Sequence, residues 1–136
     1  MVLDEFVKKY EGKKVDYDGR YGAQCVDLFR QYCKDVLNIP HTGGVTGAEE
    51  LFTKYEKLPL EQKYFNRIVY AGGTPEPGDV VIFKSTENNK FGHVAIVIAA
   101  SDTEITVFEQ DGFNQDGAKI IRRSYKTVLG FLRSKK

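Results

Sequence analysis

The first half of the chain carries apolar residues at helical spacing. They recur every three or four positions over residues 3–11, and Gly12 ends that pattern. A longer pattern from Ala23 to Leu37 predicts a second helix, whose apolar stripe consists of Val26, Phe29, Cys33 and Val36. Two shorter helices are expected over Ala48–Tyr55 and near Glu61–Asn66. The first half is therefore predicted to be helical.

The second half changes to the pattern of a sheet. Short apolar runs separated by polar turns predict strands over Val80–Ser85, Gly92–Ala100 and Glu104–Gln110. The segments "AKIIRRSY" and "VLGFLR" predict two more. Helices that precede an antiparallel sheet are typical of an α+β fold. We expect a single domain over residues 1–136, with the helix that starts near Cys25 packed on the sheet.

Composition and charge exclude several classes of function. Hydrophobic residues make up 41% of the chain and charged residues 29%, as in ordinary globular proteins. The net charge of +1 gives no overall basic field for nucleic acid, and we interpret the pair Arg122–Arg123 as solvated surface. No apolar run approaches the roughly 20 residues of a membrane helix, and the N-terminal segment does not resemble a secretory signal. We expect a monomer that does not insert into membranes.

The two cysteines are predicted to differ in role. Cys25 and Cys33 lie eight positions apart, about 12 Å along one helix, whereas a disulfide needs Cα atoms within about 7 Å. Both are therefore expected to be free thiols. Cys33 lies on the apolar stripe and is expected to be buried. Cys25 falls in the first turn, where free N–H groups and the helix dipole stabilise a thiolate and can hold an oxyanion.

A nucleophilic thiol needs a base, and the chain offers only His41 and His93. His41 follows Pro40 in a glycine-rich loop, whereas His93 opens the apolar strand. Glu109 ends the neighbouring strand, where its carboxylate can orient an imidazole. Each of these residues alone is more often structural. The order of Cys25, His93 and Glu109 on a helix start, a strand start and a strand end favours a thiol-dependent hydrolase.

Four segments, "YGAQCVDLFRQY", "PGDVVIF", "GHVAIVIA" and "VFEQDG", resemble the CHAP family, the cysteine, histidine-dependent amidohydrolases/peptidases. These are papain-like hydrolases of bacterial peptidoglycan, common in phage endolysins. The resemblance extends from about Asp4 to Arg133. It implies a papain-like α+β fold with Cys25 as nucleophile, His93 as general base and Glu109 as the residue that orients His93. It also implies a protein without a signal peptide, made in the host cytoplasm and released to the wall, or acting on the wall from outside.

One position departs from the family pattern. The family usually has Asn two residues after the glutamate, and this chain has Asp111. Asp111 could accept a hydrogen bond from His93 or have no role. Gln24 could help the Cys25 N–H to hold an oxyanion, or could simply be exposed. Three aromatic residues flank the motifs and could line a substrate groove: Tyr21, Phe91 and Phe113.

Acidic residues crowd around Cys25, although nearby negative charge disfavours a thiolate. The stretch "DYDGRYGAQCVD" resembles the calcium-binding loop found in a subset of phage CHAP domains, and a bound cation would neutralise these acids. Ca²⁺ takes six to eight oxygen ligands. The expected ligands are the carboxylates of Asp16, Asp18 and Asp27 and the carbonyl oxygens of Arg20 and Gly22. The other interpretation is a solvated turn without metal.

The sequence thus predicts hydrolysis of an amide bond in peptidoglycan, either muramoyl–L-alanine or a bond within the stem or cross-bridge peptide. Two other functions stay open. One is a related thiol peptidase of the NlpC/P60 type, against which "EQDG" and the acidic loop argue. The other is a calcium-dependent module that binds the cell wall and whose thiol is idle.

Overall fold

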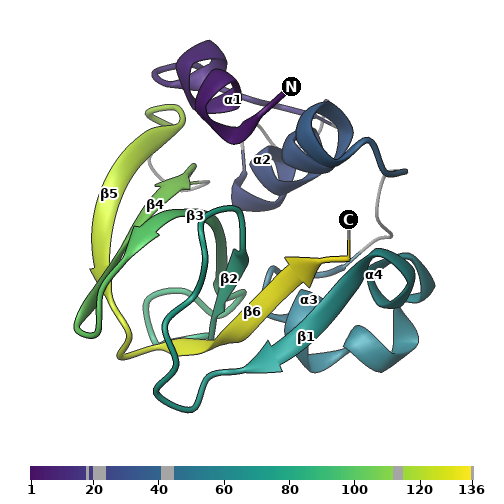
Figure 1. Ribbon diagram of the computed structural model, residues 1–136, viewed down its shortest axis with the longest axis vertical. Coiled ribbons are helices and arrows are strands. Elements are labelled where there is room, and N and C mark those ends of the chain that lie inside the picture. Colours follow the sequence, from purple (N-terminus) through teal and green to yellow (C-terminus); the bar gives the residue numbers. More distant parts are fainter. Residues whose placement is uncertain (18, 20–23, 41–44, 112–114, 136) are drawn as a thin grey trace.

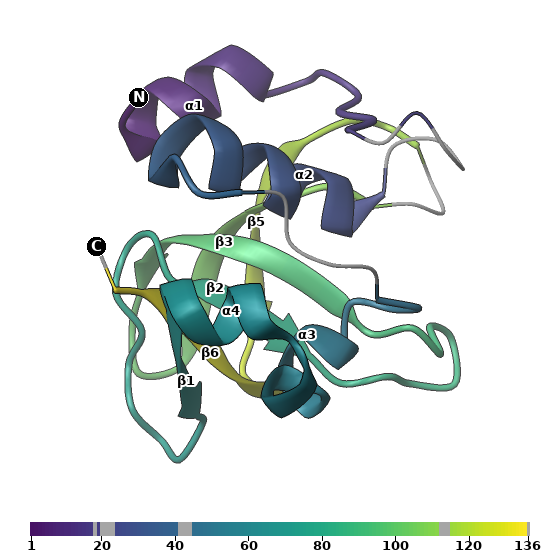
Figure 2. The ribbon, with the colours of Figure 1, turned by 90° about the vertical axis from the view of Figure 1, so that its right-hand side faces the viewer.

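The computed structural model describes residues 1–17, 19, 24–40, 45–111 and 115–135. Its helical elements pack around a single curved sheet (Figure 1). The α-helices are α1 (Leu3–Tyr10), α2 (Cys25–Tyr32), α3 (Glu50–Thr53) and α4 (Pro59–Tyr64). A π-helical turn, Cys33–Leu37, continues α2, and a 3₁₀ turn, Tyr55–Lys57, follows α3. Figure 2 shows α1 and α2 together on one side of the sheet, with α3 and α4 near its β1–β6 end.

The described strands form one antiparallel sheet in the order β1-β6-β2-β3-β4-β5. They are β1 (Phe65–Val69), β2 (Val80–Phe83), β3 (His93–Ala100), β4 (Glu104–Glu109), β5 (Lys119–Ser124) and β6 (Val128–Ser134). Strands β2 and β3 pair so that Phe83 lies opposite His93. The α+β, papain-like fold class expected from the sequence is confirmed.

Both faces of the central strands are buried, which explains their nearly continuous apolar sequences. Alternate residues face two separate clusters. The face under α1 and α2 contributes Val80, Ile82, Val94, Ile96, Phe108 and Leu132. The opposite face, enclosed by the curl of the sheet, contributes Val81, Phe83, Ala95, Val97, Ile105, Val107 and Phe131.

The secondary structure differs from the expectations in two details. The helix expected over Ala23–Leu37 does run to Leu37, but it is α-helical only to Tyr32; a π-helical turn continues it over Cys33–Leu37, and Asn38, whose φ is 54°, follows as the cap. One apolar stripe fits both geometries over a single turn, so periodicity could not separate them. The helix expected near Glu61–Asn66 ends at Tyr64, and β1 follows directly. Residues 65–69 form a strand because they pair with β6, which is far away in the sequence. The residues of β1 alone therefore do not indicate a strand.

Among the described residues, no helix has the length and apolar character needed to cross a bilayer.

Candidate active site

Cys25 is the first residue of α2, and the start of that helix is fixed by its neighbours. The backbone N–H of Gln24 donates to Oδ2 of Asp27 at 3.1 Å, and the N–H of Asp27 donates to the carbonyl of Gln24 at 3.1 Å. This reciprocal pair caps the helix. Cys25 stays partly exposed, whereas Cys33 is fully buried, and burial raises the pKa of the Cys33 thiol. The two thiols therefore differ as expected.

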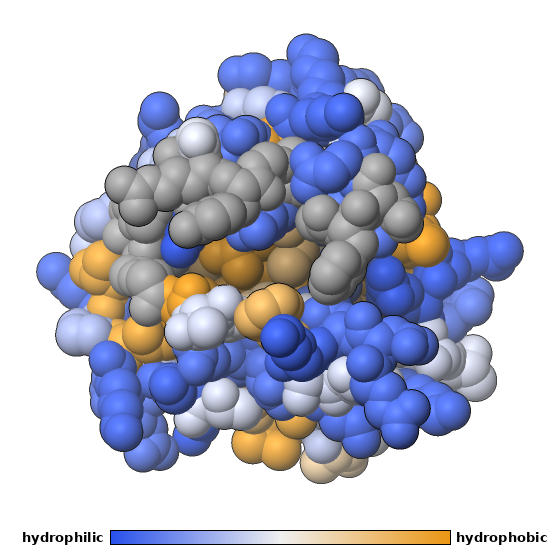
Figure 3. Space-filling model, turned by 180° about the vertical axis from the view of Figure 1, so that it is seen from behind, coloured by the Kyte–Doolittle hydropathy of each residue, from blue (hydrophilic) through white to orange (hydrophobic). Residues whose placement is uncertain are grey.

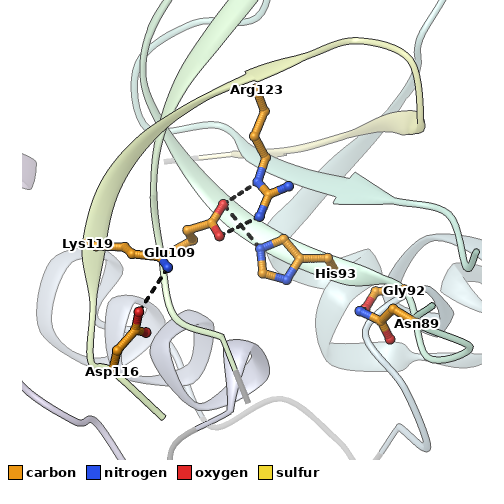
Figure 4. A network of polar contacts seen from close by, with 7 residues as sticks. All are labelled: Asn89, Gly92, His93, Glu109, Asp116, Lys119 and Arg123. Atoms are coloured by element: carbon orange, nitrogen blue, oxygen red, sulfur yellow. Dashed lines mark hydrogen bonds and ion pairs between the residues drawn. The ribbon is translucent and has the colours of Figure 1, made fainter. Parts of the chain in front are cut away.

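A tight turn delivers His93 to the start of β3. Nδ2 of Asn89 donates to the carbonyl of Gly92 at 2.7 Å (Figure 4). The N–H of Phe91 donates to Oδ1 of Asn89 at 3.1 Å. Gly92 has a φ of +76°, and a Cβ there would lie 2.7 Å from the carbonyl oxygen of Phe83. Only glycine fits this position without strain. The turn thereby fixes the backbone next to the imidazole.

His93 lies between the thiol and a buried carboxylate. Its Nε2 is 3.2 Å from Oε1 of Glu109, a close contact without the alignment of a good hydrogen bond. Because Nε2 faces Glu109, Nδ1 is the nitrogen left to act on Cys25. Burial lowers the pKa of His93, but the contacts with Cys25 and Glu109 outweigh it and raise that pKa to about 9. The arrangement favours an imidazolium beside the thiol.

Glu109 has a second partner that the sequence did not reveal. Its side chain is fully buried. Arg123 donates two hydrogen bonds to it, from Nε to Oε1 at 2.5 Å and from Nη2 to Oε2 at 2.6 Å (Figure 4). Burial raises the pKa of Glu109, but the guanidinium of Arg123 and the nearby imidazole of His93 outweigh it and lower that pKa to about 2. The interpretation of Arg123 as solvated surface was therefore wrong. It holds for Arg122, whose side chain is 74% exposed.

A cleft of about 310 Å³ opens beside Cys25 and His93. Asp111 and Gln24 line it, as does Phe91, which is 42% exposed. The space-filling view from behind shows a hollow with apolar atoms on its floor (Figure 3). The remaining walls come from Val26, Arg30, Val45, Thr46, Gly47, Ala48, Asn89 and Gly92. His41, Tyr21 and Phe113 lie outside the described residues.

Gln110 links the start of α2 to the sheet, a role that was not predicted from the sequence. It is fully buried, and its Oε1 accepts from the N–H of Val15 at 2.7 Å. Its Nε2 donates to the carbonyl oxygens of Val15 at 2.7 Å and Gln24 at 2.8 Å. Gln110 therefore sets the distance between the end of β4 and the start of α2. The sequence offered one indication of this role, because Glu109 and Gln110 are two consecutive polar residues at the end of an apolar strand.

Three of the five expected calcium ligands, Asp18, Arg20 and Gly22, lie outside the described residues. Asp16 is exposed and fits a cation ligand. Asp27 fits poorly, because its carboxylate is 1% exposed, caps α2 and lies 3.8 Å from Nη1 of Arg30. Within the described parts of the chain, no three or more His, Cys, Asp or Glu side chains are grouped to hold a metal.

A sequence model of the CHAP domain matches residues 14–111, which are most of the chain and include Cys25, His93 and Glu109. The chain belongs to the CHAP domain family. Among curated proteins it is 31% identical over 99 residues to the D-alanyl-L-alanine endopeptidase of Streptococcus phage B30, covering 70% of this chain and 21% of that protein. It is 27% identical over 135 residues to endolysin PlyTW of Staphylococcus phage Twort, covering 96% and 26%.

A solved structure shares the CHAP fold of this chain. The crystal structure of the wild-type endolysin LysIME-EF1 superposes with a TM-score of 0.76 at 27% identity, covering 98% of this chain and 64% of that one. The chain spans about a quarter of the length of the two curated relatives. Those relatives are therefore much longer than the domain described here.

Proposed function

We propose that this domain hydrolyses an amide bond of bacterial peptidoglycan, with Cys25 as the nucleophile. The observation that carries the proposal is the placement of a helix-start thiol beside His93, at the edge of an open cleft. The imidazole in turn contacts a buried carboxylate, which is the arrangement that activates a thiol. The names of the relatives, an endopeptidase and an endolysin of phages, support peptidoglycan as the substrate.

In the proposed reaction, Cys25 forms a thiolate by giving its proton to Nδ1 of His93. The thiolate attacks the amide carbon, and the developing oxyanion is held by N–H groups at the start of α2. His93 then protonates the leaving amine, which leaves an acyl group on the sulfur. Water, deprotonated by His93, releases the acid and restores the thiol. Glu109 holds the imidazole in one orientation and stabilises its charged form.

The bond cut is proposed to be a peptide bond, because the relative from phage B30 is named for cleavage between D-alanine and L-alanine. The muramoyl–L-alanine bond is the other candidate from the family resemblance. Mass spectrometry of digested walls separates the two. Cleavage between D-alanine and L-alanine leaves a new D-alanine carboxyl terminus and keeps the stem peptide joined to muramic acid, whereas an amidase frees the muramic acid carboxylate.

The test compares two cysteine variants on purified walls. Cys25→Ser is expected to release no new amines while keeping its melting temperature. Cys33→Ser is the matched control, since it lies on the same helical segment, is fully buried and is expected to keep activity at a stability cost of about 1 kcal/mol. Full activity in Cys25→Ser would refute the mechanism. Walls that bind the wild type but stay uncut would favour the binding module instead.

We also propose calcium as a structural ligand of the loop before α2, on the family resemblance and on the exposed carboxylate of Asp16. Asp18 and the carbonyl oxygens of Arg20 and Gly22 complete the proposed ligand set. When bound, Ca²⁺ supplies positive charge and loop order and takes no part in the bond cleavage.

A further inference from the structure

Glu109 carries a charge where water cannot reach it. Its side chain has no exposed surface, and a buried carboxylate without a partner costs several kcal/mol. His93 cannot be the permanent partner, because in the proposed reaction it gives its proton to the leaving amine. At that moment Glu109 would be a buried anion next to a neutral ring. A second and constant positive charge is therefore needed.

Arg123 supplies a charge that does not titrate in the working range of pH. In the register of β4 and β5 it lies opposite Ile105, four residues before Glu109, so its side chain must run along the sheet to reach the carboxylate. The two residues project from the same face. The fork of the guanidinium then meets both carboxylate oxygens (Figure 4). Such a bidentate pair fixes the orientation of the carboxylate as well as its charge.

An aromatic side chain supports both cationic groups of this network. The ring of Phe83 lies 5.5 Å from the guanidinium carbon of Arg123 and 5.6 Å from the ring centre of His93. Phe83 is buried and pairs with His93 in the sheet. The guanidinium of Arg123 is thus bound by the carboxylate and also lies near an aromatic face.

We infer that Arg123 is a positioning residue of the active site, which fixes and charge-balances Glu109 so that Glu109 can hold His93 through both of its protonation states. This inference rests on the proposed thiol mechanism. In this proposal Arg123 contacts Glu109 rather than the reacting atoms. It acts through Glu109, and its loss is expected to change the turnover number and the pH profile.

The expected effects separate Arg123 from a residue that only stabilises the fold. In Arg123→Gln, kcat is expected to fall about 10- to 100-fold with KM nearly unchanged, as for other groups that orient a reacting residue. The pKa of Glu109 rises when its main hydrogen-bond donor is lost. The acid limb of the pH–activity profile is therefore expected to move by about one unit toward higher pH. Arg123→Lys keeps the charge without the fork and should recover part of both losses.

The experiment measures peptidoglycan hydrolysis and, separately, the rate of Cys25 alkylation by iodoacetamide from about pH 2, the pKa of Glu109, to about pH 10. Arg122→Gln is the matched control, because Arg122 is the adjacent residue, is 74% exposed and pairs only loosely with Glu104 at 3.6 Å. It is expected to match the wild type in both assays. Circular dichroism and thermal melting confirm that each variant is folded.

A shifted acid limb in both Arg123 variants, with Arg122→Gln unchanged, supports the inference. An unshifted profile in folded Arg123→Gln would overturn it. If that variant does not fold, Arg123→Lys decides alone, and a wild-type profile there overturns the inference equally. If the wild type does not cut walls, the proposed function fails, whereas the alkylation profile still tests the coupling of Arg123 to the Cys25–His93 pair.

Discussion

Replacing Glu109 by Gln removes the charge that holds the imidazolium while keeping the shape of the side chain. The pKa of His93 rises from its ordinary 6.5 to about 9 despite burial, which opposes it. At about 1.4 kcal/mol per pKa unit, this corresponds to roughly 3 kcal/mol in favour of the charged ring. The contacts with Cys25 and Glu109 supply this gain and also offset the opposing effect of burial. If the two contribute equally, Glu109→Gln lowers the pKa of His93 by at least about one unit.

The sign of the effect follows from the reaction. His93 must be protonated to pair with the thiolate and to supply a proton to the leaving amine, so activity falls as pH rises through the pKa of His93. The basic limb is therefore expected near pH 9 in the wild type. In Glu109→Gln it should lie about one unit lower, with kcat reduced about 10- to 100-fold at neutral pH.

The assay is the pH dependence of kcat/KM on soluble wall fragments, paired with the ¹⁵N chemical shifts of the His93 ring. Glu104→Gln is a matched control, because Glu104 begins the same strand and its side chain is 47% exposed. In Glu109→Gln the guanidinium of Arg123, which is 37% exposed, can turn to solvent, so the variant is expected to fold. A basic limb that stays at the wild-type position in Glu109→Gln would refute the electrostatic reasoning.

Three further predictions concern the elements that hold the site. Gly92→Ala should lower both the melting temperature and the activity, because the added Cβ would collide with the carbonyl oxygen of Phe83. Gly72→Ala is the control: its φ is also positive, but no atom lies near the added Cβ, so activity should be kept. Gln110→Leu should lower kcat, and it should lower the free energy of unfolding by about 1–3 kcal/mol, because backbone groups of Val15 and Gln24 lose their partner. A melting temperature equal to that of the wild type would contradict this. EDTA should lower the melting temperature and the rate of wall lysis, and Ca²⁺ should restore both better than Mg²⁺. A melting temperature that EDTA does not change would contradict a metal role for the acidic loop.

The sequence carried enough signal for the fold class and for three side chains of the site. Apolar runs bounded by turns located the strands from β2 to β6, because local alternation and turn residues determine them. Cys25, His93 and Glu109 lie at the ends of a helix and two strands, and the structure brings them together at one end of β3 and β4.

Arg123 and Gln110 could not be found in the same way. The partner of Arg123 lies on another strand and out of register, so a basic residue in an alternating strand looked like ordinary surface. Gln110 contacts Val15, 95 residues earlier in the chain. Both roles depend on how the sheet curls, which no local pattern encodes. β1 was missed for the same reason, since its partner is the last strand.

The crowding of acids around Cys25 first raised the question of how a thiolate could form there. In the described residues, the two buried acids of the site are balanced by the protein itself. Asp27 is engaged by the cap of α2 and by Arg30, and Glu109 is engaged by Arg123 and His93. The need for an external cation is then confined to the exposed Asp16 and its neighbour Asp18. Calcium is accordingly expected to order the loop before the helix, while the charge state of the Cys25–His93 pair depends on Glu109 and Arg123.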